Sequence, residues 1–341
     1  MSRFGRKIAR PPRDPVPEVE AELLETIRDG IPCTMDDVAK ECSESRLICG
    51  VEVACYTVTN WGNRHDNEDR VMTARGCQGD LNYHTIGVLD GHDTADASDA
   101  VSQMLPGTLA KHFKAGLPID EAMKTTMADC EQSLKKSVAS AGTCVLSCTV
   151  AGRYVWCANL GDCRAGLVML QVPESASSPT KAETLYWMSR DQKASTPEEM
   201  KRIRAAGGRV ANGRVEGLEP SRTLGDFDVK MQVPPGVISI DPEVRCFNLG
   251  SGALPVQAVM VCATDGVWDV ISGQDICNLI HARKELAELQ TTMLQGGSGR
   301  ADTQPLRDLA QDLVQFAVAR GSRDDCTAVT AMITVSQRQR E

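Results

Sequence analysis

Two apolar runs of this sequence each end in an aspartate followed by glycine, at Asp90 and at Asp265. A further acidic pair, Asp324 and Asp325, shortly precedes the apolar run 328–335. Strands that finish in Asp-Gly place a carboxylate at the rim of a sheet. Carboxylates gathered from distant parts of a chain form an oxygen-rich site that suits Mg²⁺ or Mn²⁺. A single Asp-Gly pair is more typical of a hairpin turn, so the metal hypothesis depends on the whole set.

The hydrophobic pattern indicates which elements position these carboxylates. Strand-like runs come in hairpins, such as 144–158, and helical runs fall in long blocks rather than alternating with single strands. This pattern predicts an α+β fold with packed, mainly antiparallel sheets covered by helices, and argues against a doubly wound parallel sheet. The predicted helices are 17–30, a stretch after His92 that Pro106 interrupts, 119–138, one from Thr196 that stops before Gly207, 273–290 and 305–319.

The chain divides into a tail and one large domain. Residues 1–17 are basic and rich in proline, so with the short helix after them we interpret residues 1–50 as an N-terminal extension. Residues 51–338 carry the strand and helix pattern and are predicted to form a single domain.

Composition excludes several classes of protein. The net charge of −9 argues against broad nucleic-acid binding, which needs a basic face. No hydrophobic signal segment opens the chain, and no apolar run approaches the roughly 18 residues of a membrane span. The 14 cysteines lie mostly in apolar stretches without paired C-x-x-C spacing, which predicts reduced, buried thiols. We therefore expect a cytoplasmic or nuclear protein, and a monomer.

Eight short motifs follow one another in a fixed order along the chain. They are 61–69 (WGNRHDNED), 90–92 (DGH), 141–143 (AGT), 159–164 (NLGDCR), 207–208 (GG), 221–226 (SRTLGD), 264–269 (TDGVWD) and 322–325 (SRDD). Together they resemble the protein phosphatase 2C family of metal-dependent serine/threonine phosphatases, over roughly residues 52–335.

The resemblance implies a fold and a place for the site. The family fold is a four-layer αββα sandwich, with two central, mainly antiparallel sheets flanked by helices and a two-metal site at one edge. A flap-like subregion is expected at about residues 191–235. The substrates implied are phosphoserine and phosphothreonine proteins, and the cofactors are two Mg²⁺ or Mn²⁺ ions per active site.

The resemblance also assigns ligands, position by position. One metal would be held by Glu68, Asp90 and the backbone carbonyl of Gly91, and the other by Asp90, Asp265 and Asp324. Two further positions, Asp162 and Asp269, match together with Asp265 those that hold a weaker third metal in some members. Around these ligands the resemblance places Asp69, Thr143 and Asp325.

The chemistry of phosphate monoesters explains why such residues are needed. These esters are anionic and hydrolyse very slowly, so catalysis needs charge neutralisation and a strong nucleophile. Two metals about 3.5–4 Å apart can ionise a bridging water, and the resulting hydroxide would attack the phosphorus in line. Arg64 offers a planar fork for phosphate oxygens. His92 can donate a proton to the leaving alkoxide as a general acid. Cys277 and Arg283 have C-x₅-R spacing, but they lie inside the predicted helix 273–290 rather than in a loop, so no phosphocysteine route is expected.

Departures from the family pattern leave alternatives open. Asp93 and Thr94 stand where the family usually has glycines, and Gln192 replaces a usual histidine. A catalytically silent binding or regulatory module, or a hydrolase of another phosphate monoester, therefore remains an alternative to an active protein phosphatase. Arg222 and Asp226 are interpreted as a structural pair, or as part of the loop flap that the resemblance places beside the cleft.

Overall fold

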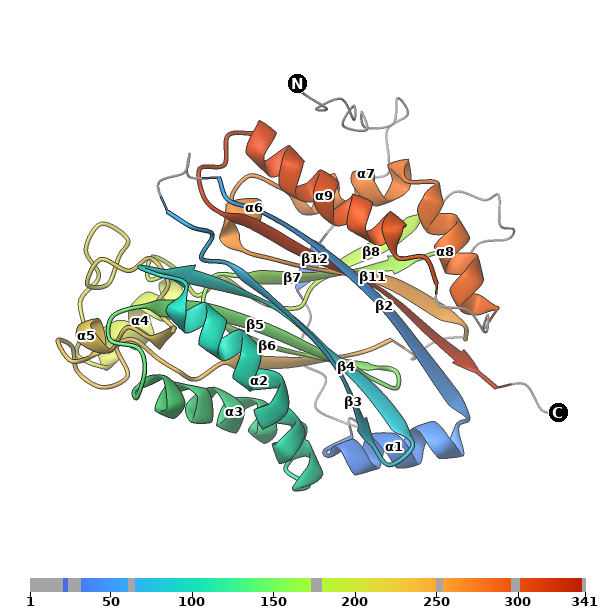
Figure 1. The fold of residues 1–341 in the computed structure, drawn as a ribbon, viewed down its shortest axis with the longest axis horizontal. Helices are drawn as coiled ribbons and strands as arrows, with labels where there is room; N and C mark the ends of the chain where they lie inside the picture. Colours follow the sequence, from blue (N-terminus) through green and yellow to red (C-terminus); the bar gives the residue numbers. More distant parts are fainter. Residues whose placement is uncertain are drawn as a thin grey trace.

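Two β-sheets packed face to face form the centre of the molecule (Figure 1). The computed structural model describes residues 21–23, 32–60, 65–172, 180–249, 254–295 and 301–338. The first sheet has the strand order β1 (Ala21–Leu23), β8 (Ala182–Trp187), β7 (Arg164–Leu170), β11 (Val256–Ala263), β12 (Cys326–Gln337) and β2 (Leu47–Val58). The second has the order β10 (Glu243–Asn248), β6 (Tyr154–Leu160), β5 (Gly142–Ala151), β4 (Leu81–His92) and β3 (Arg70–Gln78), with β9 (Leu224–Gly225) paired to β5.

Within the described ranges, every strand pair in the two sheets is antiparallel except β1 with β8. Helices cover both outer faces (Figure 1). The first sheet carries α6 (Asp265–Trp268), α7 (Gly273–Ala282), α8 (Glu285–Leu294) and α9 (Gln304–Ala319), and the second carries α1 (Met35–Glu44), α2 (Asp96–Lys114) and α3 (Ile119–Leu134). The predicted four-layer αββα sandwich is confirmed.

Three hydrophobic clusters hold the four layers together. Each outer cluster joins the helices to one sheet, and the middle cluster joins the two sheets. Strands whose two faces are both covered lack the apolar–polar alternation of half-exposed strands, and β5 and β6 are buried along their whole length. Burial in these layers is the main source of stability for such a sandwich.

A smaller unit lies at one end of the sandwich. It contains α4 (Pro197–Ala205) and α5 (Phe227–Lys230), with a hydrophobic cluster of its own. That cluster includes Ala194, Ile203 and Val215. This unit falls within the range 191–235 in which the sequence predicted a flap-like subregion.

Three sequence predictions about helices are wrong. The helix α2 passes through Pro106, although proline removes one backbone hydrogen bond. Its buried face, which includes Val101, Leu105 and Leu109, packs on the second sheet and compensates for that loss. Residues 21–23 of the predicted helix 17–30 form a strand beside β8, and the rest of that prediction lies outside the described residues.

The third wrong prediction is a single helix over 273–290. Arg283 has an extended backbone and separates α7 from α8. Its guanidinium donates hydrogen bonds to the backbone carbonyl of Asp308, at 2.7 Å, and to the side chain of Asp312. These contacts with α9 hold the chain at the break between α7 and α8.

Most of the 14 cysteines are buried, as predicted, among them Cys144 and Cys262. Cys33, Cys55 and Cys77 are exposed, so the prediction is wrong for those three residues. None of the helices in the described ranges is long and apolar enough to cross a membrane.

Candidate active site

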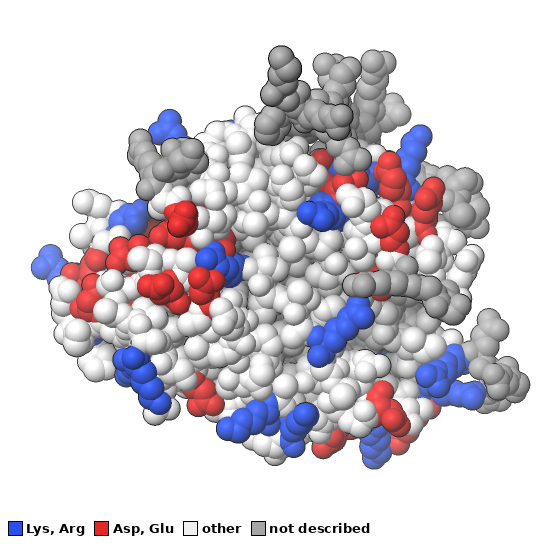
Figure 2. Space-filling model, viewed as in Figure 1, with Lys and Arg blue, Asp and Glu red and all other residues white. Residues whose placement is uncertain are grey.

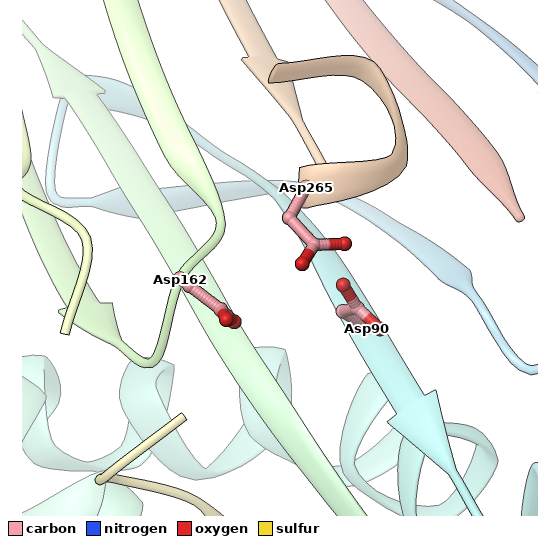
Figure 3. Close-up of side chains that lie close together, drawn as sticks. All are labelled: Asp90, Asp162 and Asp265. Carbon is pink, nitrogen blue, oxygen red and sulfur yellow. The ribbon is translucent and has the colours of Figure 1, made fainter. Parts of the chain in front are cut away.

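Three aspartates from different parts of the chain converge at one edge of the sandwich (Figure 3). Asp90 lies near the end of β4, Asp162 lies in the turn between β6 and β7, and Asp265 begins α6 directly after β11. Each offers a carboxylate oxygen, and these oxygens all lie within 4.8 Å of one another. In Figure 3 the carboxylates of Asp90 and Asp265 point toward each other, and Asp162 points into the same space. Acidic side chains also gather on the face of the molecule at the left of Figure 2.

Glycines allow the backbone to approach closely around these carboxylates. A Cβ atom on Gly91 would lie 2.5 Å from the carbonyl oxygen of Glu68. A Cβ atom on Gly266 would lie 2.0 Å from the carbonyl oxygen of Asp325. Real Cβ atoms do not come this close, so the glycine of each Asp-Gly pair lets the backbone of another predicted site residue pack directly against it.

The carboxylates destabilise one another's charged forms. Burial and then the neighbouring charges of Asp265 and Asp69 raise the pKa of Asp90 well above its usual value. Burial and the charge of Asp162 do the same to the pKa of Asp265, against the opposing effect of Lys193. Burial likewise raises the pKa of Asp162. A site that crowds several carboxylates in this way is stabilised by a cation.

Asp69 is a buried acid behind this cluster. It accepts a hydrogen bond from the Thr264 hydroxyl at 2.9 Å, and burial raises its pKa to about 7. Thr264 also accepts a hydrogen bond from the backbone N–H of Thr327, at 3.2 Å. These contacts link Asp69 to the residue that directly precedes Asp265.

Asp325 connects the loop that carries Glu68 to the start of β12. Its two carboxylate oxygens accept the backbone N–H groups of Asn60, at 3.1 Å, and of Glu68, at 2.9 Å. The Asn60 side chain in turn donates to the carbonyl of Ser322 at 2.6 Å. Asp325 is buried and therefore holds both ends of the segment 60–68. Within that segment Arg64, the predicted phosphate ligand, lies outside the described residues.

The remaining predicted metal ligands lie around the cluster. Glu68 is largely buried, and burial raises its pKa. Asp324 is exposed, and its charge is among those that raise the pKa values of Asp90 and Asp265 after the effect of burial. Asp269 is 59% exposed at its side chain and contacts Lys193. The structure thus groups Asp90, Asp162 and Asp265 most tightly. Glu68, Asp324 and Asp269 lie around this group.

His92 has a buried partner that the sequence did not predict. Its Nε2 atom lies 2.7 Å from Oδ1 of Asp226. The other oxygen of Asp226 accepts the Thr223 hydroxyl at 2.5 Å. Burial alone would lower the pKa of His92, but the hydrogen bond and charge of Asp226 outweigh it and raise that pKa. Gly142 leaves room for this pair, because a Cβ there would lie 2.2 Å from the Asp226 carboxylate.

The expected pairing of Arg222 with Asp226 is therefore wrong. Arg222 instead binds both oxygens of Glu199, at 2.5 and 3.1 Å. Glu199 also accepts hydrogen bonds from Arg202, at 2.7 Å, and from Ser221, at 2.6 Å. These four residues form the polar centre of the unit around α4.

Asp93 takes the backbone conformation that a glycine would favour. Its φ angle is +73°, in the left-handed region. Aspartate tolerates this region better than most residues, since its short polar side chain can bond locally. The departure from the family pattern after His92 thus preserves a glycine-like turn.

Thr143 and Cys144 support the cluster from β5. The Thr143 hydroxyl donates to the carbonyl of Asp90 at 3.1 Å. The Cys144 thiol donates to a carboxylate oxygen of Asp162 at 3.2 Å. Burial raises the pKa of this thiol well above its usual value, so it remains a neutral donor.

The donor set fits small divalent cations. All its side-chain ligands are carboxylates, and carboxylate oxygens are the preferred protein ligands of Mg²⁺ and of Mn²⁺. The carboxylates are already clustered within one space and repel one another, which a dication would relieve.

Comparison with known proteins identifies the family of this chain. The family described as protein phosphatase 2C matches residues 56–326. A rice protein named probable protein phosphatase 2C 30 is 33% identical over 266 residues, covering 68% of this chain and 60% of that protein. The rice probable protein phosphatase 2C 54 is 27% identical over 248 residues, covering 71% of this chain and 60% of its own length. The chain thus spans about three fifths of these relatives.

Solved structures share the fold. A serine-threonine phosphatase 2C from Toxoplasma gondii superimposes with a TM-score of 0.55 at 20% identity, covering 84% of this chain and 99% of that chain. A C. elegans sex determining protein gives a TM-score of 0.61 at 20% identity, covering 83% of this chain and 65% of that chain.

The family match covers most of the chain and coincides with the sandwich and its acidic edge. The class defined by this fold is that of αββα sandwiches with two central, mainly antiparallel sheets. Within that class, the chain belongs to the protein phosphatase 2C family.

Proposed function

We propose that this protein is an active Mg²⁺- or Mn²⁺-dependent phosphatase of phosphoserine and phosphothreonine proteins. The observation that carries the proposal is the convergence of Asp90, Asp162 and Asp265 within 4.8 Å, in a chain of this family. Glu68, Asp324 and the carbonyl of Gly91 would complete the ligand set. When bound, the metals supply charge neutralisation and an activated water for attack on phosphorus.

The chain's own residues prepare the site for this reaction. Thr143 donates to the carbonyl of Asp90 and Cys144 to the carboxylate of Asp162, while Asp69 accepts the hydroxyl of Thr264, the residue before Asp265. These hydrogen bonds fix the geometry of the ligands before substrate binds. Asp325 holds both ends of the segment that contains Arg64. Arg64 would bind the phosphate oxygens of the substrate, as its guanidinium is suited to do.

His92, held by Asp226, would protonate the leaving group. A protonated His92 donates its Nε2–H to Asp226, which leaves the Nδ1–H for the alkoxide of the departing serine or threonine. Asp226 therefore acts as a positioning residue, and its raising effect on the pKa of His92 favours the protonated form.

Phosphate release from a phosphothreonine peptide, measured with Mn²⁺ and with a chelator, tests the proposal. We expect turnover only with the metal, and a loss of at least about 100-fold in Asp265→Asn. The matched control is Asp228→Asn, which removes the same charge from an exposed position on α5. Absence of turnover by the folded, Mn²⁺-loaded protein would refute the proposal and favour a silent binding module.

A further inference from the structure

Lys193 lies between the metal-site carboxylates and the unit around α4. Its ammonium is 3.5 Å from Asp265 and 3.1 Å from Asp269. On the other side it is 3.0 Å from Glu219, which also accepts Arg214 at 2.7 Å. Two of the carboxylates that Lys193 contacts are thus candidate metal ligands, and the third belongs to the neighbouring unit.

The backbone beside Lys193 is held in place. Asp191 forms two hydrogen bonds with Arg164, at 2.8 and 2.6 Å. The Gln192 side chain accepts the N–H of Gly161 at 2.8 Å, and the carbonyl of Gln192 accepts the N–H of Ser221 at 2.8 Å. These contacts fix the backbone next to Lys193. The part of Lys193 that can move is therefore its flexible side chain.

Lys193 is enclosed by acidic side chains. Its own side chain is only 15% exposed, and its ammonium lies 3.0 to 3.5 Å from the carboxylates of Asp265, Asp269 and Glu219. A cation that approaches Asp265 therefore meets the lysine ammonium at close range.

We propose that the Lys193 ammonium competes with a divalent cation for Asp265 and Asp269, and that Glu219 receives the ammonium when the cation binds. The proposal shares with the proposed function only the premise that these carboxylates bind a divalent cation. It makes Lys193 a positioning residue that weakens one cation site and links its occupancy to the unit around α4.

Simple electrostatics gives the direction and size of the effect. Two unit charges 4 Å apart interact by about 1 kcal/mol even in bulk water, and a dication doubles that repulsion. Removing the lysine charge should therefore strengthen the weakest cation-binding step by about tenfold or more.

The first test is calorimetric titration of the substrate-free protein with Mn²⁺ alone. In Lys193→Met, which keeps the side-chain length, we expect the weakest resolved dissociation constant to fall by about tenfold. Lys193→Arg should keep the wild-type value, because the charge remains. Lys201→Met is the matched control, since Lys201 is exposed on α4 and its loss changes the net charge equally.

The second test uses a substitution that should weaken Mn²⁺ binding rather than strengthen it. Glu219→Gln removes the group that draws Lys193 away from Asp265 and Asp269, so the ammonium should pair more fully with them. We expect the weakest Mn²⁺ step to become several-fold weaker. The control Glu216→Gln removes an equal charge from an exposed position three residues away and should have a smaller effect.

These outcomes separate the competition from the catalytic proposal. Unchanged or weaker Mn²⁺ binding in folded Lys193→Met would overturn the competition, whatever the enzymatic activity. If that variant does not fold, the competition is overturned by Glu219→Gln matching Glu216→Gln in Mn²⁺ affinity. Normal Mn²⁺ effects without phosphate release would refute the phosphatase and leave the competition intact.

Discussion

Glu199 provides a stability test of the unit beside the active site. Its carboxylate is 6% exposed and accepts hydrogen bonds from Arg222, Ser221 and Arg202. Burial alone would raise its pKa, but these hydrogen bonds lower it from 4.5 to about 2. Each pKa unit is equivalent to 1.36 kcal/mol, so the ionised form stabilises the fold by about 3 kcal/mol relative to the protonated form.

The dependence on pH follows from the lowered pKa. Above 4.5 the carboxylate is ionised in both the folded and the unfolded protein, and the full stabilisation is present. Between 4.5 and about 2 the unfolded chain binds a proton before the folded one does, so the stabilisation is lost as the pH falls through this window.

Urea unfolding of Glu199→Gln at several pH values measures this contribution. At pH 7 we expect the free energy of unfolding to fall by about 3 kcal/mol, because two guanidinium groups lose their shared carboxylate. The difference from wild type should narrow as the pH decreases from 4.5. Glu198→Gln, at the exposed neighbouring position on α4, should change the free energy by less than about 0.5 kcal/mol.

Two results would refute the reasoning. Equal effects of Glu199→Gln and Glu198→Gln would show that the buried cluster does not stabilise the fold. A large effect of Glu199→Gln that stays constant down to pH 3 would show that the carboxylate's charge is not its source.

Three other predictions concern the site. Asp265→Asn should abolish the rise in melting temperature that Mn²⁺ gives to the wild-type protein. In chelator the melting temperature of the variant should not fall, because the substitution removes a repulsive charge. A normal Mn²⁺ response of the variant would contradict this prediction. Asp325→Asn loses one of two acceptors for the partly buried N–H groups of Asn60 and Glu68 and should lower the free energy of urea unfolding by about 1–3 kcal/mol. An unchanged unfolding midpoint would show that Asp325 does not hold the two ends of the segment 60–68 together. Asp93→Gly should retain turnover within about threefold. Asp93→Val should lower the stability of the protein by about 1–2 kcal/mol, because a branched side chain is strained at a φ of +73°. Equal stability of the two variants in thermal unfolding would disprove this backbone strain.

The layered fold and the main carboxylates were predictable from the sequence. Asp90 and Asp265 follow strongly apolar runs, and the Asp-Gly pairs mark the sheet rim where the structure places them. The order of the motifs identified the family, which the comparison confirmed. All of the ligand roles, those of the tight cluster as well as those of Glu68 and Asp324, remain predictions.

Partners that meet only through tertiary folding were not predictable. His92 and Asp226 are 134 positions apart, and no local pattern relates them. Arg222 and Asp226 have the spacing of an ion pair, yet tertiary packing gives Arg222 a different acid. Pro106 was interpreted as a helix end because local propensity does not include the packing of α2 on its sheet.

The three clustered aspartates come from different layers of the fold, which has a consequence for the rest of the core. Asp90 extends from one sheet, Asp265 follows a strand of the other, and Asp162 sits where the chain crosses between them. Any lateral slip of the two layers would change the spacing of the carboxylates directly. Substitutions among tightly packed interlayer side chains, such as Cys148 and Cys262, should therefore alter metal preference from a distance.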